Sequence, residues 1–392
     1  MMDFFGGGRA RRALQRAATF ARGGWVYVAP NDVWRFDTGG GKRILGIAGE
    51  VAKESQVVVL SVGEKGETHV VFRKLGGGVG ILRAEAGDWR MVERMMEGAR
   101  GWIFVNPLQY VEWKEWRPGE DDKRVVYDAH DVFVEAYGRF GIGKETLMAA
   151  ERRLLEDAER VWFCTEADRE TTRRRYADLD GSGWGILPNG IDRKEMGEVV
   201  VPSETRKRRA ALGWSRPVAL FAGANYGPNY EAVDRISREW APKHPGVTFV
   251  VLGMRMDRYL RDGGVQPAPN VVFTGLVSEE EKRALYDLAE VAIVPVKRGT
   301  GSSLKVPEAI ARGKVVIGTR VGLRGFKEWT KWESVIMSEK GEEELGQVFA
   351  RLDKDPQAYA EACQGAAEEM QRRYIWDALM EKWKGSWDTE NG

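Results

Sequence analysis

The sequence predicts an α/β fold in which two similar halves each alternate buried strands with helices. Short apolar runs of strand length recur along the chain, separated by stretches of helical periodicity. A Pro-Asn-Gly turn at 188–190 and a charged stretch at 195–209 lie between the halves. The stretch 291–325 has the order strand, glycine-rich loop, helix, strand. These patterns predict two Rossmann-like domains divided between Asp192 and Arg209.

Composition excludes several classes of protein. The 392 residues include 60 Lys and Arg against 59 Asp and Glu, a net charge of +1 that gives no global reason to expect a nucleic-acid partner. Cys164 and Cys363 lie far apart without metal-ligand spacing, so we expect neither a disulfide framework nor a zinc site, and a reducing cytosol fits. No apolar run approaches the roughly 20 residues needed to cross a bilayer, so we expect no membrane-spanning segment.

Residues 1–24 are basic and allow two interpretations. Asp3 is the only acid in this segment, whose arginines are Arg9, Arg11, Arg12, Arg16 and Arg22. A basic segment headed by Phe4 and Phe5 can rest on an anionic membrane surface. The alternative is a frayed, solvated extension. The apolar face of the segment is weak, which favours the extension; its members are Ala13, Leu14, Ala17 and Ala18.

The first half opens with a predicted strand, Trp25–Ala29, a loop with three consecutive glycines, and a helix through Ile44. A strand, a glycine turn and a helix in this order favour close approach of backbone to a ligand. Gly39 and Gly40 are therefore candidate binding residues. The alternative is a helix entry that needs positive φ.

A second candidate position lies in the stretch Arg124–Asp131, a predicted buried strand that leads directly into polar residues at its carboxyl end. Open α/β sheets place their ligands at that edge. His130 can hydrogen-bond a ligand there, or it can cap the strand end with Asp131 as its orienting partner. The aromatic stretch 102–116 can stack on sugars or cover lipid, but core packing is the favoured interpretation.

The second half opens with the predicted strand Val218–Ala222, and Gly223, Asn225 and Asn229 follow it in the first loop of a mononucleotide-binding fold. Val291–Val294 and Val315–Ile317 are predicted strands of a parallel sheet. Because proline fits only a helix's first turn, Pro307 makes the intervening helix begin close to residue 303. The loop before it thus offers an anion site to which Gly299, Gly301, Ser302 and Ser303 contribute.

Lys305 and Glu308 sharpen this prediction. A cation in a helix's first turn opposes the helix dipole unless an anion lies between them, and a phosphate is such an anion. Glu308 is three residues further on, so both side chains project from one face, and its carboxylate can hold ribose hydroxyls. The alternative is an acid that favours a helix start and pairs with Lys305 on the surface.

The run 295–325 resembles the donor-site signature of retaining, family-four glycosyltransferases with the GT-B fold. The shared pattern is a proline, a Gly-x-Gly loop, a lysine, then Glu-Ala and a small-residue helix. The resemblance implies two Rossmann-like domains with a cleft between them and a C-terminal helix that returns to the first. We accordingly expect a basic extension at 1–24, an acceptor domain at 25–200, a nucleotide-sugar domain at 201–365 and the returning helix at 366–392.

The resemblance also implies roles for individual residues. Catalytic candidates are His130 beside the donor sugar, Asp131, and Lys305 at the diphosphate. The expected donor-binding residues are Gly39, Gly40, Gly223, Asn225, Gly275, Val277, Arg298, Gly299, Thr300, Gly301, Ser302, Ser303, Lys305 and Glu308. The family's better-known version has two glutamates eight positions apart; the second falls on Glu308, and Thr300 takes the place of the first.

The implied activity is transfer of a hexosyl group from a nucleotide sugar to an acceptor hydroxyl with retention, without a metal or cofactor. The donor is expected to be UDP- or GDP-linked, and the acceptor a glycan, a lipid-linked sugar or a small molecule. The expected location is the cytoplasm, with peripheral membrane contact through the basic N-terminus open. Two alternatives remain: an epimerase of sugar nucleotides, or a catalytically silent protein that binds them.

Overall fold

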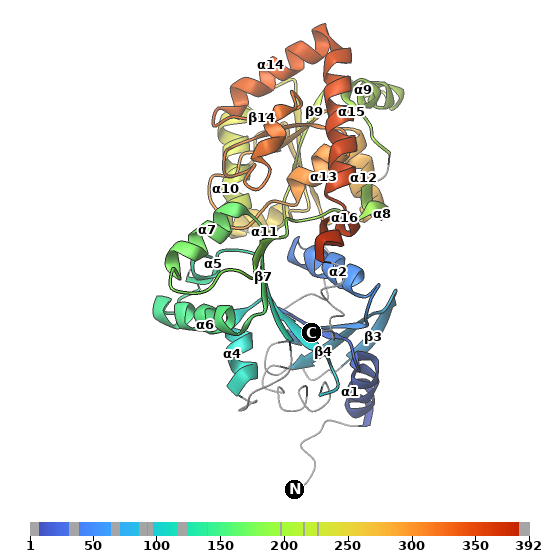
Figure 1. Cartoon of the computed structure of the whole chain (residues 1–392). Coiled ribbons are helices and arrows are strands. Elements are labelled where there is room, and N and C mark those ends of the chain that lie inside the picture. The colour runs from blue at the N-terminus through green and yellow to red at the C-terminus, as the bar shows by residue number, and fades with distance from the viewer. Residues whose placement is uncertain are drawn as a thin grey trace. The chain divides into compact units, whose positions relative to one another are not determined.

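The computed structural model divides the chain into two compact units, and each is described by itself (Figure 1). The first comprises residues 1–188 and 379–392, and the second comprises residues 189–378. The residues that the structure describes are 8–30, 39–63, 71–85, 92, 97–115, 124–138, 140–196, 198–214, 216–225 and 227–383.

The first unit is built on one sheet. Its strands within the described residues have the order β3-β4-β2-β1-β5-β6-β7-β8, and all neighbours are parallel except the β3–β4 hairpin. Because β2 lies on one side of β1 and β5 on the other, the strand order reverses beside β1, where open α/β sheets bind ligands. The bounds are β1 Trp25–Ala29, β2 Val57–Gly63, β3 Val71–Gly76, β4 Val79–Glu85, β5 Gly101–Phe104, β6 Arg124–Ala129, β7 Arg160–Phe163 and β8 Trp184–Ile186.

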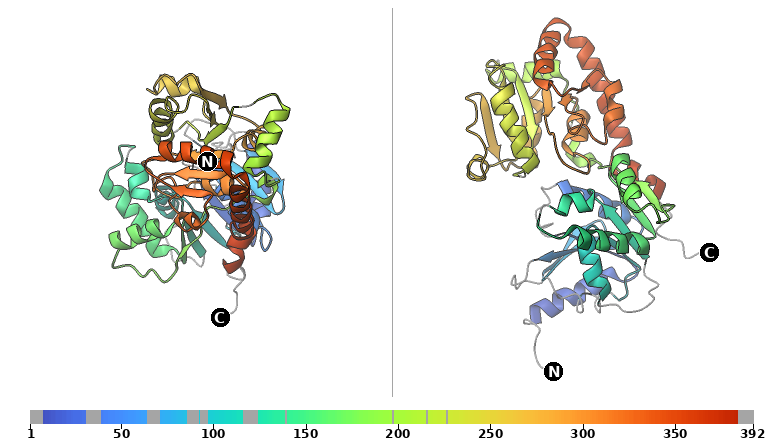
Figure 2. Two further views of the ribbon diagram at one scale, coloured as in Figure 1. Left: turned by 90° about the horizontal axis from the view of Figure 1, so that it is seen from above. Right: turned by 90° about the vertical axis from the view of Figure 1, so that its left-hand side faces the viewer.

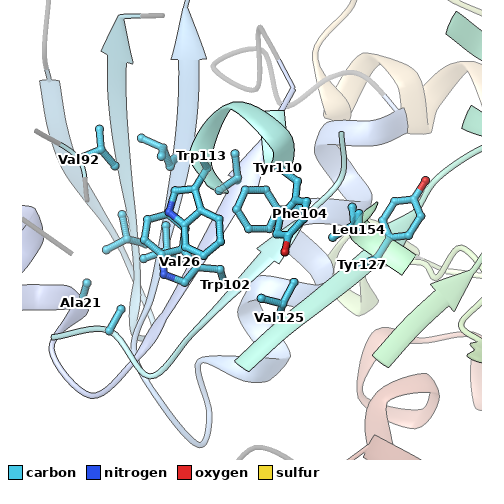
Figure 3. Close-up of a cluster of buried hydrophobic side chains, with 14 of the residues drawn as sticks. Ala21, Val26, Val92, Trp102, Phe104, Tyr110, Trp113, Val125, Tyr127 and Leu154 are labelled. Atoms are coloured by element: carbon cyan, nitrogen blue, oxygen red, sulfur yellow. The ribbon is translucent and has the colours of Figure 1, made fainter. Parts of the chain in front are cut away.

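Aromatic side chains fill the core of the first unit (Figure 3). The Trp102 and Trp113 rings lie 5.1 Å apart, Phe104 and Tyr110 are also 5.1 Å apart, and all four are at most 1% exposed. The favoured interpretation of the aromatic stretch as core is therefore confirmed for these residues; Trp116 lies outside the described residues. The helices are α1 Gly8–Ala21, α2 Gly39–Val51, α4 Pro107–Glu115, α5 Phe133–Gly138, α6 Lys144–Asp157 and α7 Glu166–Arg175, with the short η3 Glu381–Trp383.

The N-terminal helix corrects one interpretation. Leu14, Ala17 and Ala21 of α1 are buried in the same core cluster. The interpretation as a frayed extension is therefore wrong for Gly8–Ala21, because even this narrow apolar stripe packs on the sheet. Phe4 and Phe5 lie outside the described residues.

The second unit contains an entirely parallel sheet. Its strands within the described part of the chain have the order β11-β10-β9-β12-β13-β14, so the order reverses between β9 and β12. The loops after these two strands are the two that the sequence singles out. The bounds are β9 Val218–Ala222, β10 Thr248–Leu252, β11 Val271–Gly275, β12 Val291–Val294, β13 Val315–Gly318 and β14 Val335–Met337.

Helices cover both faces of this sheet, and the long α15 contacts α13 and α9 (Figure 2). Pro307 is the third residue of α13, where its missing amide costs no intrahelical hydrogen bond. The helices are α8 Arg193–Met196, α9 Pro202–Ala211, α10 Gly227–Arg235, η1 Ile236–Trp240, α11 Met256–Arg261, α12 Glu279–Asp287, α13 Lys305–Ala311, η2 Lys327–Lys331, α14 Gly341–Lys354, α15 Pro356–Arg373 and α16 Trp376–Met380.

Candidate functional site

In the first unit, Gly40 and His130 are neighbours. Gly39 and Gly40 form the start of α2, and a β-carbon on Gly40 would lie 3.6 Å from His130 Nδ1. His130 follows β6 directly, and its side chain is 15% exposed. The structure thus brings together the glycine turn after β1 and the histidine after β6.

Asp128, rather than Asp131, holds the His130 ring. His130 Nε2 lies 2.8 Å from Asp128 Oδ2, and Asp128 is completely buried. Tyr27 Oη from β1 donates to the same Oδ2. The Arg43 guanidinium from α2 donates to Asp128 Oδ1 through Nε at 2.9 Å and Nη2 at 2.6 Å. The carboxylate therefore joins β1, β6 and α2.

Charge inside this cluster is compensated. Burial alone would raise the pKa of Asp128, but the Arg43 guanidinium and His130 hold it well below its usual range. Burial, and then the Asp128 carboxylate, raise the pKa of Tyr27 well above its ordinary value. The cluster accordingly contains an ionised carboxylate, a guanidinium and a neutral phenol, an arrangement that desolvation tolerates only because every partner is hydrogen-bonded.

In the second unit, Lys305 lies between the two loops at the strand-order reversal. Lys305 Nζ donates to Asn229 Oδ1 at 2.9 Å and lies 4.3 Å from the centre of the Phe221 ring. Asn229 in turn donates through Nδ2 to Ala224 O at 3.0 Å, which holds it against the loop after β9. Gly223 allows this packing, since a β-carbon there would lie 2.8 Å from Phe221.

No carboxylate pairs with Lys305 among the described residues. Burial lowers the pKa of Lys305 to about 7, because its ammonium exchanges water for one amide oxygen and an aromatic face. Burial also lowers the pKa of Lys314 in this unit to about 7. Lys314 is 1% exposed and donates to Val200 O and Thr205 Oγ1, so it belongs to the interior.

The glycine-rich loop before α13 is held from two sides. Arg324 donates through Nε to Gly301 O at 2.5 Å and through Nη1 to Gly299 O. Asn189 Nδ2 donates to Ser302 O at 3.1 Å and to Ser302 Oγ at 2.9 Å. Gly299 and Gly301 have φ values of +133° and +71°, which L side chains rarely adopt. The loop is therefore fixed before any ligand arrives.

Glu308 does not pair with Lys305. Its carboxylate receives Lys282 Nζ from α12 and, at 3.2 Å, Arg312 Nη2 from its own helix. The Glu308 side chain is 17% exposed. The two cations fix where it points.

The remaining candidates of the second unit lie in the glycine-rich loop, after β9 and at the end of β11. Arg298 is 75% exposed and pairs with Glu231 of α10. Asn225 holds the turn before α11, because it donates to Arg255 O at 3.2 Å and accepts from Arg255 N at 3.0 Å. Gly275 ends β11 with φ +69°, and its oxygen accepts from Gly253 N at 3.0 Å. Thr300, Ser303 and Val277 are partly buried.

Sequence reasoning did not assign four of these side chains: Tyr27, Arg43, Lys282 and Arg324. It placed Asn229 in the first loop of the second half, without its contact to Lys305. Only the role of Asp128 left a signal, since residues two apart at a strand end share a side of the chain. Within the described residues there is no cluster of His, Cys, Asp and Glu that could hold a metal ion. No helix of that part of the chain is long and apolar enough to span a membrane.

Residues 216–368 match the family model described as glycosyl transferases group 1. No curated protein sequence matches the chain. The structure is similar to sucrose-phosphate synthase from Thermosynechococcus elongatus, at 16% identity over 92% of this chain and 97% of that one, with a TM-score of 0.68. It is similar to Anabaena HepE in complex with UDP and glucose, at 13% identity over 92% and 98%, with a TM-score of 0.67. A third relative is a UDP-forming trehalose-phosphate synthase from Burkholderia xenovorans in complex with glucose-6-phosphate, at 14% identity over 93% and 100%, with a TM-score of 0.64.

These similarities confirm the predicted fold class, the two-domain GT-B architecture with a helical C-terminal region. The family match lies within the second half of the chain, and the similarity of fold extends over more than nine-tenths of it.

Proposed function

We propose that the protein is a retaining hexosyltransferase that takes its sugar from a UDP-linked donor. The observation that carries the proposal is the half-buried cation at the strand-order reversal of the second unit. Lys305 has lost water without gaining a counter-ion among the described residues, and a diphosphate supplies that charge. The fixed glycine-rich loop, which directly precedes Lys305, can add backbone amides. The neighbours in complex with UDP support a uridine nucleotide.

Retention assigns simple tasks to the residues. The acceptor hydroxyl approaches on the side from which the diphosphate departs, and the departing phosphate oxygen takes its proton. Lys305 and the loop amides neutralise the charge that develops on that phosphate, so this chemistry requires no divalent metal. His130 orients the sugar through a hydroxyl, and Glu308 holds the ribose.

A two-part experiment tests the proposal. First, UDP-, GDP- and ADP-sugars are compared for thermal stabilisation, and a UDP-hexose should give the largest rise in melting temperature. Second, NMR of the product with that donor reports the anomeric configuration, and activity is measured in excess EDTA. We expect retention and undiminished activity. An inverted product would instead require a general base, with His130 or Asp131 as the nearest side chains.

Two other functions are separated by the same assays. An epimerase would convert the donor without an added acceptor. A catalytically silent binding protein would be stabilised by the donor but would neither transfer nor hydrolyse it. Thr300, in the place of the family's first glutamate, is the residue that gives the silent alternative its basis.

The acceptor is proposed to be a glycan or a lipid-linked sugar, with peripheral membrane contact through α1. Arg12 and Arg16 are exposed on this helix, which contains no acid, whereas its apolar stripe is already buried. Contact would therefore be electrostatic, and binding to vesicles with anionic lipid should fall steeply with salt. Equal binding to neutral vesicles would contradict it.

A further inference from the structure

The hydrogen bond between Asp128 and His130 determines more than the position of the ring. A neutral imidazole carries its proton on one nitrogen, and the partner of the other nitrogen selects which. In this protein the partner of Nε2 is Asp128 Oδ2, at 2.8 Å. An ionised carboxylate only accepts hydrogen bonds, so Nε2 must carry the proton.

Arg43 ensures that this carboxylate stays an acceptor. It covers Oδ1 with two N–H groups, and its Nη1 donates to Leu187 O at 2.8 Å, so the guanidinium is fixed at both ends. Both Arg43 and Asp128 are at most 1% exposed. Burial of the pair leaves neither group a competing water partner.

The proton on Nε2 has a consequence for Nδ1, on the other side of the His130 ring. Nδ1 faces the start of α2, since a β-carbon on Gly40 would be 3.6 Å away. Within the described residues no hydrogen bond reaches Nδ1. In the tautomer that Asp128 enforces, Nδ1 presents an unoccupied lone pair, which accepts a hydrogen bond from a hydroxyl and gives none.

We infer that Asp128 is a positioning residue that locks His130 as the Nε2–H tautomer, so that Nδ1 is a fixed acceptor for a hydroxyl of the bound sugar. The role of Nδ1 toward a sugar rests on the proposed function; the tautomer does not.

The tautomer is measured directly by NMR of protein labelled with ¹⁵N at its histidines. The chain has three histidines, His69, His130 and His244, so the spectrum contains three ring systems, and the loss of one in His130→Ala assigns it. His244 is an internal reference, because its Nε2 lies 2.6 Å from the backbone oxygen of Glu342, which only accepts. The pH is raised until the rings are neutral.

We expect His130 to show a protonated Nε2 and an unprotonated Nδ1 in the wild type. Asp128→Asn should invert this pattern. Arg43 should donate to the oxygen of the new amide, so that the amide NH₂ group faces His130 Nε2 and donates to it. Asp131→Asn, the matched control, should leave the pattern unchanged, and His244 should not respond to either change. A proton on Nδ1 in the wild type overturns the inference, whether or not Asp128→Asn folds. An unchanged tautomer in folded Asp128→Asn also overturns it.

Kinetics test whether Asp128 acts through the ring. Asp128→Asn should lower kcat while UDP affinity changes less than about twofold, and it should add less than about twofold to the loss already caused by His130→Ala. Full additivity of the two changes would contradict a positioning role. If the tautomer inverts but no sugar is transferred by any variant or by the wild type, the proposed function fails and the tautomer lock stands.

Discussion

The two polar clusters, one in each unit, both lie at the carboxyl ends of parallel strands, but they balance charge in opposite ways. In the first unit, the Asp128 carboxylate accepts hydrogen bonds from Arg43, Tyr27 and His130, so both oxygens of the buried charge are hydrogen-bonded. In the second, Lys305 has an amide oxygen and a ring face, with no carboxylate among the described residues. The first cluster is complete without a ligand and fixes a ring, whereas under the proposed function the second is completed by a bound anion.

The largest effect should come from removing the charge of Lys305, which pairs with no carboxylate among the described residues. Lys305→Met should weaken UDP binding by about 1.5–3 kcal/mol, roughly 10- to 150-fold, because a charge-assisted hydrogen bond to phosphate is lost. Uridine, which lacks phosphate, should bind both proteins alike. Lys297→Met removes an exposed lysine from the same loop and is the control. Calorimetry with both ligands measures this, and equal losses for UDP and uridine would contradict the assignment.

Glu308→Gln should cost up to the same amount, but through the ribose rather than the phosphates. The test is a thermodynamic cycle in which the affinities for UDP and 2′-deoxy-UDP are measured for the wild type and the variant. If the 2′-hydroxyl is the partner of Glu308, the preference for UDP should disappear in the variant. Lys282 and Arg312 lose their carboxylate in this variant, so a melting curve accompanies the binding data. A preserved preference, with activity unchanged, would leave Glu308 a structural partner of these two cations.

His130→Ala should have a smaller effect, confined to turnover. Loss of a neutral hydrogen bond to the sugar is worth about 0.5–1.5 kcal/mol, roughly 2- to 13-fold in kcat. UDP affinity should stay nearly constant, since the proposal assigns His130 to the sugar and not to the nucleotide. Steady-state kinetics with titration of UDP separate the two quantities, and parallel losses in both would show that His130 supports nucleotide binding instead.

The smallest effect is expected from Arg298→Ala. The structure pairs this exposed side chain with Glu231, an arrangement that contributes little at the surface. Donor affinity and kcat should each change less than about threefold. A large loss of UDP affinity would mean that Arg298 leaves Glu231 to contact the diphosphate, as the sequence resemblance implies.

The sequence predicted the strands well because each is a short apolar run with defined ends. Trp25–Ala29, Val218–Ala222 and Val291–Val294 are strands at the predicted bounds. The glycine-rich loops and Lys305 were found because glycine and a misplaced cation in a helix's first turn leave local signals.

The partners of these residues could not be predicted, because they come from distant parts of the chain. Arg43 and Asp128 are 85 positions apart, and Lys305 and Asn229 are 76 apart. The expectation that Lys305 and Glu308 act from one face used helix spacing alone. Tertiary neighbours then decide the directions: Lys305 donates to Asn229, while Glu308 pairs with Lys282.

The pH dependence of stability follows from the same burial. The pKa of Lys305 falls from 10.5 to about 7 on folding, so between these values the unfolded chain binds a proton that the folded chain does not. Stability therefore rises with pH across this window and is lost as pH falls toward 7. Lys314 contributes with the same sign. Lys305→Met should flatten part of this dependence in denaturant titrations, and an unchanged slope would contradict a lowered pKa.

Proton uptake on donor binding tests the central claim most directly. UDP-glucose is the probe, because its phosphates do not titrate near neutral pH. At about pH 8, free Lys305 is mostly neutral, and a bound diphosphate should restore its charge. Calorimetry in two buffers of different ionisation enthalpy should show uptake of about one proton by the wild type and almost none by Lys305→Met. Binding without proton uptake, or equal uptake by the variant, would contradict the conclusion that Lys305 is the cation completed by the donor.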